Sequence, residues 1–135
     1  MTINFKKLLL VLFAGSLIAG CASSDEKQKA LELKADRRAD ILASSLPITY
    51  GPLTIASAKS KNSTVIIEML YNQSGNKPAN QLIDSAATYY CSSKEVRASM
   101  DEGVNYAIKI RNNRGQLVVE KVITSDSCKV QPDSN

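Results

Sequence analysis

The stretch NYAIKIRNNRGQLVVEKVI, residues 105–123, decides the fold of this chain. On both sides of its middle, apolar side chains recur in alternation with other residues, which is typical of two half-buried strands. These apolar positions are Tyr106, Ile108, Ile110, Leu117, Val119 and Ile123. Between them, residues 112–115 (NNRG) tolerate the positive φ angles of a tight turn. The stretch therefore predicts a β-hairpin.

A second hairpin is predicted upstream, from residues 53–58 and 64–71. Apolar residues occupy the odd positions of the second run, and the polar residues 61–63 are typical of a turn. In the first run only Leu53 and Ile55 are large and apolar, so its alternation is weaker.

Three helices are predicted around the hairpins. Residues 25–46 carry apolar residues at helical spacing and stop before a proline. Residues 78–91 begin with a proline, which suits the first turn of a helix, and carry a second apolar stripe. A short helix over residues 92–103 follows, and Ser92 and Glu95 have the spacing of a capping box at its start.

The order of these elements, α-β-β-α-α-β-β, predicts an α+β domain. We expect a four-stranded antiparallel sheet, made of the two hairpins and flanked by helices. Its core face takes Ile67, Met69, Tyr106, Ile108, Leu117 and Val119. The opposite face also receives apolar residues, beside charged ones: Ile66, Leu70, Val118 and Val122. That face has two interpretations, because the first helix covers it or it lines a groove for a partner.

The start of the chain predicts the compartment. Two lysines and the apolar stretch 8–18 are typical of a secretory signal peptide, too short to remain as a membrane-spanning anchor. Residues 18–21 (IAGC) resemble the bacterial lipobox, in which the cysteine takes a diacylglycerol and becomes the first mature residue. We therefore expect a lipid on Cys21 rather than a plain secreted protein. Each buried methylene contributes about 0.8 kcal/mol, so several acyl chains make a firm anchor.

The chain then divides into a signal peptide 1–20, a lipidated tether 21–24, one domain over 25–131 and a polar tail 132–135. In enterobacterial sorting, an Asp after the lipidated cysteine retains a lipoprotein in the inner membrane. Here that position is Ala22, so the motif implies export to the periplasmic face of the outer membrane.

Composition argues against several function classes. Removal of residues 1–20 leaves 115 residues, enough for one small domain. That part holds 15 basic and 13 acidic residues without a basic cluster, so nucleic acid is not an expected partner. His is absent, which removes the commonest general base and the commonest metal ligand. We expect no metal site and no cofactor beyond the covalent lipid.

Catalysis has little support in the sequence. Ser92, Ser93, Asp101 and Glu102 could be offered as a site, for instance of a hydrolase. Without His, a serine nucleophile would need a Lys base, and no spacing suggests one. Clustered Ser and Asp near a helix start are more often caps, so we do not expect an enzyme.

Three cysteines are present, and assigning Cys21 to lipid leaves Cys91 and Cys128. The periplasm is oxidising, so this pair predicts one structural disulfide. Its loop would enclose 36 residues, for which loop-closure entropy gives about 3–4 kcal/mol of stabilisation. A zinc site or a reactive thiol would need further ligands or an activating base, and neither is visible.

Three segments carry a resemblance to a known family: GCAS at 20–23, ASSLPITYGPLTIASAKS at 43–60 and DEGVNYAIKIRN at 101–112. In order and spacing, and with the cysteine pair, they resemble the AspS-like α/β pilotins of type II secretion, also called YghG-like or GspS-beta. The resemblance covers essentially the whole mature chain. It implies an antiparallel sheet flanked by helices, unlike the all-helical pilotins of other systems.

The resemblance also implies a function without chemistry. Such a pilotin is an outer-membrane lipoprotein that binds the C-terminal S-domain of the secretin. It uses the lipoprotein sorting machinery and directs the targeting and assembly of the secretin in the outer membrane. A secretin segment that is disordered alone could fold as an amphipathic helix against an apolar groove.

Candidate partner-binding residues are the four apolar ones opposite the core face, Ile66, Leu70, Val118 and Val122. Another class of periplasm-facing lipoprotein, such as an assembly accessory or a lysozyme inhibitor, would share the lipobox and the disulfide. That class is the alternative hypothesis.

Overall fold

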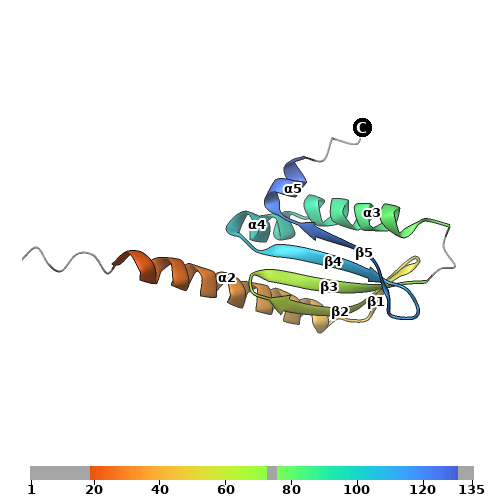
Figure 1. The fold of residues 1–135 in the computed structure, drawn as a ribbon, viewed down its shortest axis with the longest axis horizontal. Helices are drawn as coiled ribbons and strands as arrows, with labels where there is room; N and C mark the ends of the chain where they lie inside the picture. Colours follow the sequence, from red (N-terminus) through yellow and green to blue (C-terminus); the bar gives the residue numbers. More distant parts are fainter. Residues whose placement is uncertain (1–18, 73–75, 131–135) are drawn as a thin grey trace, which may run out of the picture. The chain divides into compact units, whose positions relative to one another are not determined.

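The computed structural model describes residues 19–72 and 76–130. In chain order, the elements are α2 (Ala19–Ala43), β1 (Ile48–Tyr50), β2 (Leu53–Lys61), β3 (Thr64–Tyr71), α3 (Ala79–Ser92), α4 (Lys94–Glu102), β4 (Asn105–Arg111), β5 (Leu117–Ile123) and α5 (Ser125–Lys129) (Figure 1). Residues 1–18 of the predicted signal peptide and the predicted tail 132–135 lie outside the described residues.

Contacts divide the chain into two compact units, Met1–Ala30 and Leu31–Asn135. Of the first unit the structure describes the beginning of α2, where the side chains of residues 23–30 are exposed. The sheet belongs to the second unit, and from Leu31 onward α2 contributes to the core of that unit. The helix spans Ala19–Ala43 instead of the predicted 25–46, so it also includes the predicted tether.

The sheet has five strands in the order β1-β2-β3-β4-β5. The pairs β1–β2, β2–β3 and β4–β5 are antiparallel, whereas β3 and β4 are parallel. The prediction of four antiparallel strands is therefore wrong in strand number and in the direction of the central pair. A parallel pair needs a crossover connection, and the chain makes it through α3 and α4. The sequence pattern missed β1 because a strand of three residues gives no measurable alternation.

Both predicted hairpins are confirmed. In the second, Gly115 adopts a φ of 78°. The side-chain oxygen of Asn112 accepts hydrogen bonds from the backbone N–H groups of Arg114 and Gln116, both at 3.0 Å. The strand register then shifts, because Leu117 pairs with Arg111 whereas Val119 pairs with Ile110. Leu117, predicted for the core, is consequently 48 % exposed on the opposite face.

The predicted helix boundaries in the crossover hold to within a residue or two. The N-cap of α4 is Ser93 rather than Ser92, and its hydroxyl accepts a hydrogen bond from the Val96 N–H at 3.5 Å. The carboxylate of Glu95 bonds Arg38 at 2.8 Å. α4 ends at Gly103, whose φ of 116° favours glycine and whose missing Cβ leaves room for Leu31.

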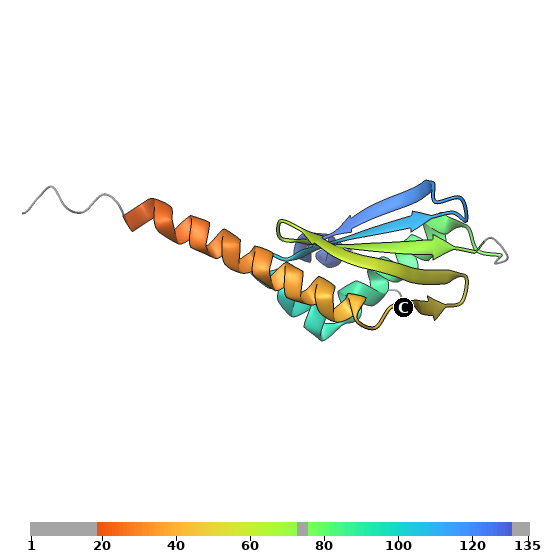
Figure 2. The same ribbon diagram turned by 90° about the horizontal axis from the view of Figure 1, so that it is seen from below.

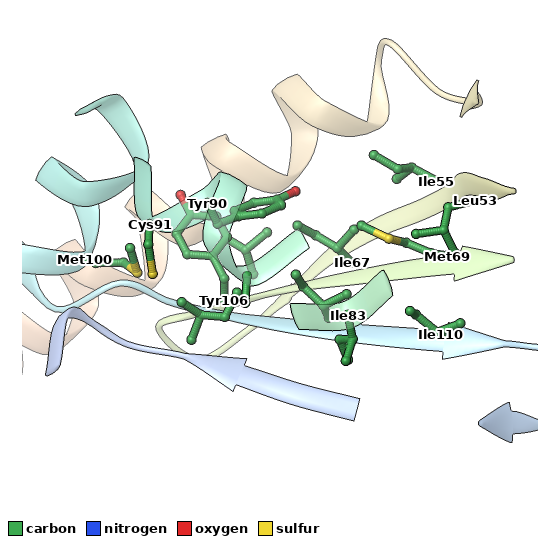
Figure 3. Packing of buried hydrophobic residues seen from close by; sticks show 14 of the residues in the cluster. Leu53, Ile55, Ile67, Met69, Ile83, Tyr90, Cys91, Met100, Tyr106 and Ile110 are labelled. Atoms are coloured by element: carbon green, nitrogen blue, oxygen red, sulfur yellow. The ribbon is translucent and has the colours of Figure 1, made fainter. Parts of the chain in front are cut away.

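One hydrophobic core lies between the sheet and the helices (Figure 3). Ala35 and Ala39 of α2 belong to the same buried cluster as Ile83 of α3, together with Ile67 and Ile108 from the central strands. The Leu31–Ala43 part of α2, α3 and α4 therefore lie on one side of the sheet (Figure 2). The first helix packs on the core face, and the interpretation that it covers the opposite face is wrong.

The predicted disulfide joins Cys91 and Cys128. Cys128 lies in α5, a short helix that the sequence pattern did not predict. α5 begins with a capping box, in which the Ser127 N–H donates to the Thr124 hydroxyl and the Thr124 N–H donates to the Ser127 hydroxyl. The disulfide thus ties the end of α3 to the segment that follows the last strand.

Removal of this disulfide should destabilise the domain without changing its fold. We expect Cys91→Ala to lower the free energy of unfolding by about 2–5 kcal/mol, because the crosslink restricts the unfolded chain. Urea denaturation measures the change, and the Cys91→Ala/Cys128→Ala variant controls for the freed thiol. A double variant as stable as the wild type would contradict this expectation.

Candidate partner-binding groove

A groove of about 390 Å³ opens on the helical side of the sheet, between the end of α2, strands β1–β3 and α3. It is lined by Leu42, Ile48, Tyr50, Leu53, Ile55, Met69, Leu82, Ser85, Ala86, Tyr89 and Tyr90. No residue of this lining is of a type charged at neutral pH. The surface is apolar and is interrupted only by the hydroxyl groups of three tyrosines and one serine.

Helix α3 forms one wall of the groove. Leu82, Ala86 and Tyr89 are spaced four and three residues apart, so they share one face of the helix. Leu82 is buried at the bottom of the wall, whereas Tyr89 is 69 % exposed. The wall thus runs from the core to the solvent.

The strands form the opposite surface. Ile55 of β2 pairs with Met69 of β3 on one side and with Ile48 of β1 on the other. Tyr50 of β1 is 63 % exposed and pairs with Leu53. The short strand β1 therefore extends the apolar floor beyond β2 and ends it with an aromatic ring.

Tyr90 is the most enclosed polar side chain of the groove, with 9 % of its surface exposed. Its ring packs on that of Tyr106 with centroids 5.5 Å apart, and the Tyr106 hydroxyl shares a hydrogen bond of 2.9 Å with Ser99. Burial raises the pKa of the Tyr90 phenol above its usual 10.0, and Tyr106 adds to the shift. The phenol is neutral at pH 7 even without this shift, so its hydroxyl has a proton to donate.

The four predicted partner-binding residues lie away from this groove, on the other face of the sheet. Ile66 is half-buried, and the exposed fractions of Leu70, Val118 and Val122 are 40 %, 47 % and 53 %. No helix of the described residues covers this surface, which we term the open face. It is formed by the outward side chains of β3, β4 and β5.

Charged residues interrupt the open face. Glu68 pairs with Lys109 across β3 and β4, and Lys109 pairs with Glu120 across β4 and β5, so one charged row crosses the three strands. Arg111 donates two hydrogen bonds to Glu68, from Nη2 at 3.0 Å and from Nε at 3.2 Å. The hydrogen bond from Arg111 holds the pKa of Glu68 below its usual 4.5, in spite of partial burial. The open face is thus less apolar than the groove.

The side chains of Cys21 and Ala22 lie outside the description, although their backbone belongs to α2. The lipidation of Cys21 and the sorting role of Ala22 therefore remain predictions. Within residues 19–72 and 76–130, no helix is long and apolar enough to cross a membrane.

The residues considered as a catalytic set have structural partners instead. Ser93 caps α4, and the Ser92 hydroxyl donates to the Tyr89 carbonyl at 2.9 Å. Asp101 accepts a hydrogen bond from Ser125, and Glu102 forms an ion pair with Lys34. The described part of the chain also holds no group of three or more His, Cys, Asp or Glu residues that could bind a metal ion.

Comparison with known proteins agrees with this fold. Residues 27–128 match the model of the family described as type II secretion system (T2SS) pilotin, S protein. The chain belongs to this pilotin family. It is 27 % identical over 125 residues to pilotin AspS 2 of Escherichia coli O78:H11, covering 90 % of this chain and 88 % of the relative. Lipoprotein YghG of E. coli K12 has the same identity and coverage.

Two solved pilotin structures are similar to this AspS-like pilotin. EpsS of Vibrio vulnificus superposes with a TM-score of 0.73 at 41 % identity, over 81 % of this chain and 99 % of that one. AspS of Vibrio cholerae also gives a TM-score of 0.73, at 42 % identity over 78 % and 99 % of the two chains. The family is a secretion accessory, which is consistent with a function other than catalysis.

Sequence reasoning missed the groove as a site, although it found part of the lining. The apolar stripe of α3 includes Leu82, Ala86 and Tyr90, but that pattern also fits an ordinary core face. The available signal was Tyr50, an aromatic residue in the segment PITYGP, where no core position is predicted. Its role appears only once β1 is seen to pair with β2.

The Glu68–Arg111 pair should make the stability of the pilotin depend on pH. The pKa of Glu68 is lower in the folded than in the unfolded chain, so its stabilisation is complete above the unfolded value and is lost as pH falls through the folded value. We expect Glu68→Gln to cost up to about 1 kcal/mol at pH 7, since the pair is partly exposed, and almost nothing near pH 3.

Urea denaturation between pH 7 and pH 3 measures this difference. Glu120→Gln is the matched control on the same face. The Glu120 Oε1 atom lies 3.7 Å from Lys109 Nζ, so this pair should contribute less to the free energy of unfolding. A cost of Glu68→Gln that is constant with pH would contradict the electrostatic explanation.

Proposed function

We propose that this pilotin binds the C-terminal S-domain of the type II secretion secretin and directs its targeting and assembly in the outer membrane. The groove between α3 and β1–β3 is the proposed binding site. The uncharged lining of this groove carries the proposal, because such a surface suits the apolar side of an amphipathic segment.

The dimensions of the groove favour a helix that lies on it rather than a helix enclosed by it. An α-helix with its side chains is about 10–12 Å wide, and a volume of about 390 Å³ holds only the side chains of one helical face. The S-domain segment would place apolar side chains three and four residues apart into the groove and keep its polar face in water.

The lipid on Cys21 would determine the membrane location of the pilotin. Among the similar proteins, YghG is named a lipoprotein, which supports the same modification here. With Ala22 after the cysteine, the lipoprotein sorting machinery would carry the pilotin and its bound secretin to the periplasmic face of the outer membrane. Membership of the pilotin family counts against the alternative of an assembly accessory or a lysozyme inhibitor.

Co-purification tests the proposal directly. The pilotin should retain full-length secretin, and it should lose a secretin truncated before its S-domain. Equal retention of both secretins would place the contact elsewhere. Normal arrival of the secretin in the outer membrane after deletion of the pilotin, in a strain without a second pilotin, would contradict the proposed role.

A charge in the groove should abolish binding. Ala86 lines the groove and is partly buried, so Ala86→Asp would place an unpaired carboxylate against the bound helix. The cost of several kcal/mol corresponds to a loss of more than about 100-fold in affinity for an S-domain peptide. Isothermal titration calorimetry measures the loss, and melting curves confirm that the variant folds.

Leu70→Asp is the matched control, because it places the same charge on the open face with Ile66, Val118 and Val122. Leu70 is already 40 % exposed, so this variant should fold and should bind the peptide as the wild type does. The opposite outcome, with binding lost in Leu70→Asp and kept in Ala86→Asp, would move the site to the open face.

The anchor and the groove should be separable. A Cys21→Ser protein behind a cleavable signal peptide should bind the S-domain peptide normally, because the disulfide and the core lie in residues 31–128. It should fail to deliver the secretin, since nothing would attach the complex to the outer membrane. Membrane fractionation measures the delivery, and secretin multimers that still reach the outer membrane would show that the lipid is dispensable.

A further inference from the structure

The hydroxyl of Tyr90 differs from the other polar groups of the groove. Ser85 donates to the Gln81 carbonyl at 2.9 Å within its own helix. Tyr50 and Tyr89 are 63 % and 69 % exposed, so water hydrates their hydroxyls. Tyr90 is 9 % exposed, and its hydroxyl makes no hydrogen bond with the described part of the chain.

The ring of Tyr90 is held in place from several sides. It packs on Tyr106, whose hydroxyl is fixed by Ser99, and the neighbouring Cys91 is joined to Cys128. In Figure 3 the ring extends from α3 toward the side of the groove where Ile55 and Met69 lie. The position of the hydroxyl is therefore set before any partner binds.

A donor in this position has a chemical requirement. A tyrosine phenol is protonated at neutral pH, and burial raises the pKa of Tyr90 further, so the hydroxyl can donate a hydrogen bond. A partner that covers the groove removes the remaining water, and an enclosed hydroxyl without an acceptor weakens binding. Only a ligand with an oxygen or nitrogen acceptor at that point would avoid the loss.

We infer that Tyr90 is a specificity-determining residue of the groove, whose hydroxyl donates a hydrogen bond to an acceptor on the bound helix. This inference rests on the proposed function and adds a polar requirement to an apolar site. The acceptor is a polar side chain on the buried face of the helix or a free carbonyl of its last turn. A purely apolar helix of the same shape would be bound less well.

Tyr90→Phe tests the inference, because it removes one oxygen and keeps the apolar wall. We expect the affinity for a synthetic S-domain peptide of the cognate secretin to fall roughly tenfold, as for one lost hydrogen bond whose acceptor becomes buried. The melting temperature without peptide should stay within a degree or two of the wild type, since the hydroxyl has no partner in the free protein. Titration calorimetry and thermal melting give the two values.

Two other tyrosines provide matched controls. Tyr106→Phe keeps the ring on which Tyr90 packs and removes only a hydroxyl that bonds Ser99 outside the groove lining, so it should lower the melting temperature and leave peptide affinity unchanged in the folded protein. Tyr89→Phe removes an exposed hydroxyl from the same groove and should change neither value.

The outcomes separate this inference from the proposed function. A change of less than twofold in Tyr90→Phe, with normal binding by the wild type, overturns the role of the hydroxyl and leaves the groove as the site. A lower melting temperature that accounts for the weaker binding also overturns it. No binding of the peptide by the wild type contradicts the proposed function together with this inference.

Discussion

The parallel pairing of β3 with β4 is the constraint on which the rest of the structure depends. Two adjacent parallel strands cannot be joined by a tight turn, so the chain must cross from the end of one to the start of the other. It does so through α3 and α4 on one face of the sheet. α2 joins the same layer from Leu31 onward, because Ala35 and Ala39 are buried in the shared core, and Arg38 and Lys34 add ion pairs with Glu95 and Glu102 of α4. One face of the sheet consequently receives α3, α4 and the Leu31–Ala43 part of α2, and the groove forms where α3 leaves the strands β1–β3 partly uncovered.

The same crossover holds α3, the helical wall of the groove, against the rest of the domain. The ring of Tyr90 lies on Tyr106 of β4, and the disulfide from Cys91 to Cys128 ties the end of α3 to α5. The hydroxyl groups of Tyr106 and Ser99 share a buried hydrogen bond, which links β4 to α4. These contacts hold the α3 wall of the groove against β4 and α5, whereas the floor of the groove is formed by β1–β3.

Local features of this fold could be predicted from the sequence, and features that depend on distant pairing could not. Alternation identified both hairpins because each is formed by neighbouring residues. The parallel pairing of β3 with β4 was not predicted, because hydrophobic alternation does not indicate which edges of two hairpins pair. Leu117 was assigned to the core because one extra residue in β5 shifts the outward and inward positions beyond it.

The candidate site shows the same division. Cys91 and Cys128 could be paired from the redox compartment alone, since only two cysteines remained after lipidation. The groove could not be found in this way, because its lining comes from α2, three strands and α3, which are far apart in the sequence. An apolar position of a core and an apolar position of a groove give the same periodicity, and only the packing distinguishes them. The proposed function therefore rests on the family resemblance, and the residue patterns alone did not indicate it.

The uncharged lining of the groove determines which terms contribute to the free energy of the proposed complex. An S-domain segment that is disordered alone would lose conformational entropy when it folds on the groove, at about 1–2 kcal/mol for each residue of backbone that becomes fixed. Apolar contacts can offset this cost, but they discriminate weakly between segments of similar shape, because one methylene changes binding only about 10- to 200-fold. The charged row Glu68–Lys109–Glu120 keeps the open face from offering a second continuous apolar surface. In the proposed complex, selection of the correct segment then depends on the hydroxyl of Tyr90, which would need an acceptor once the partner covers the groove.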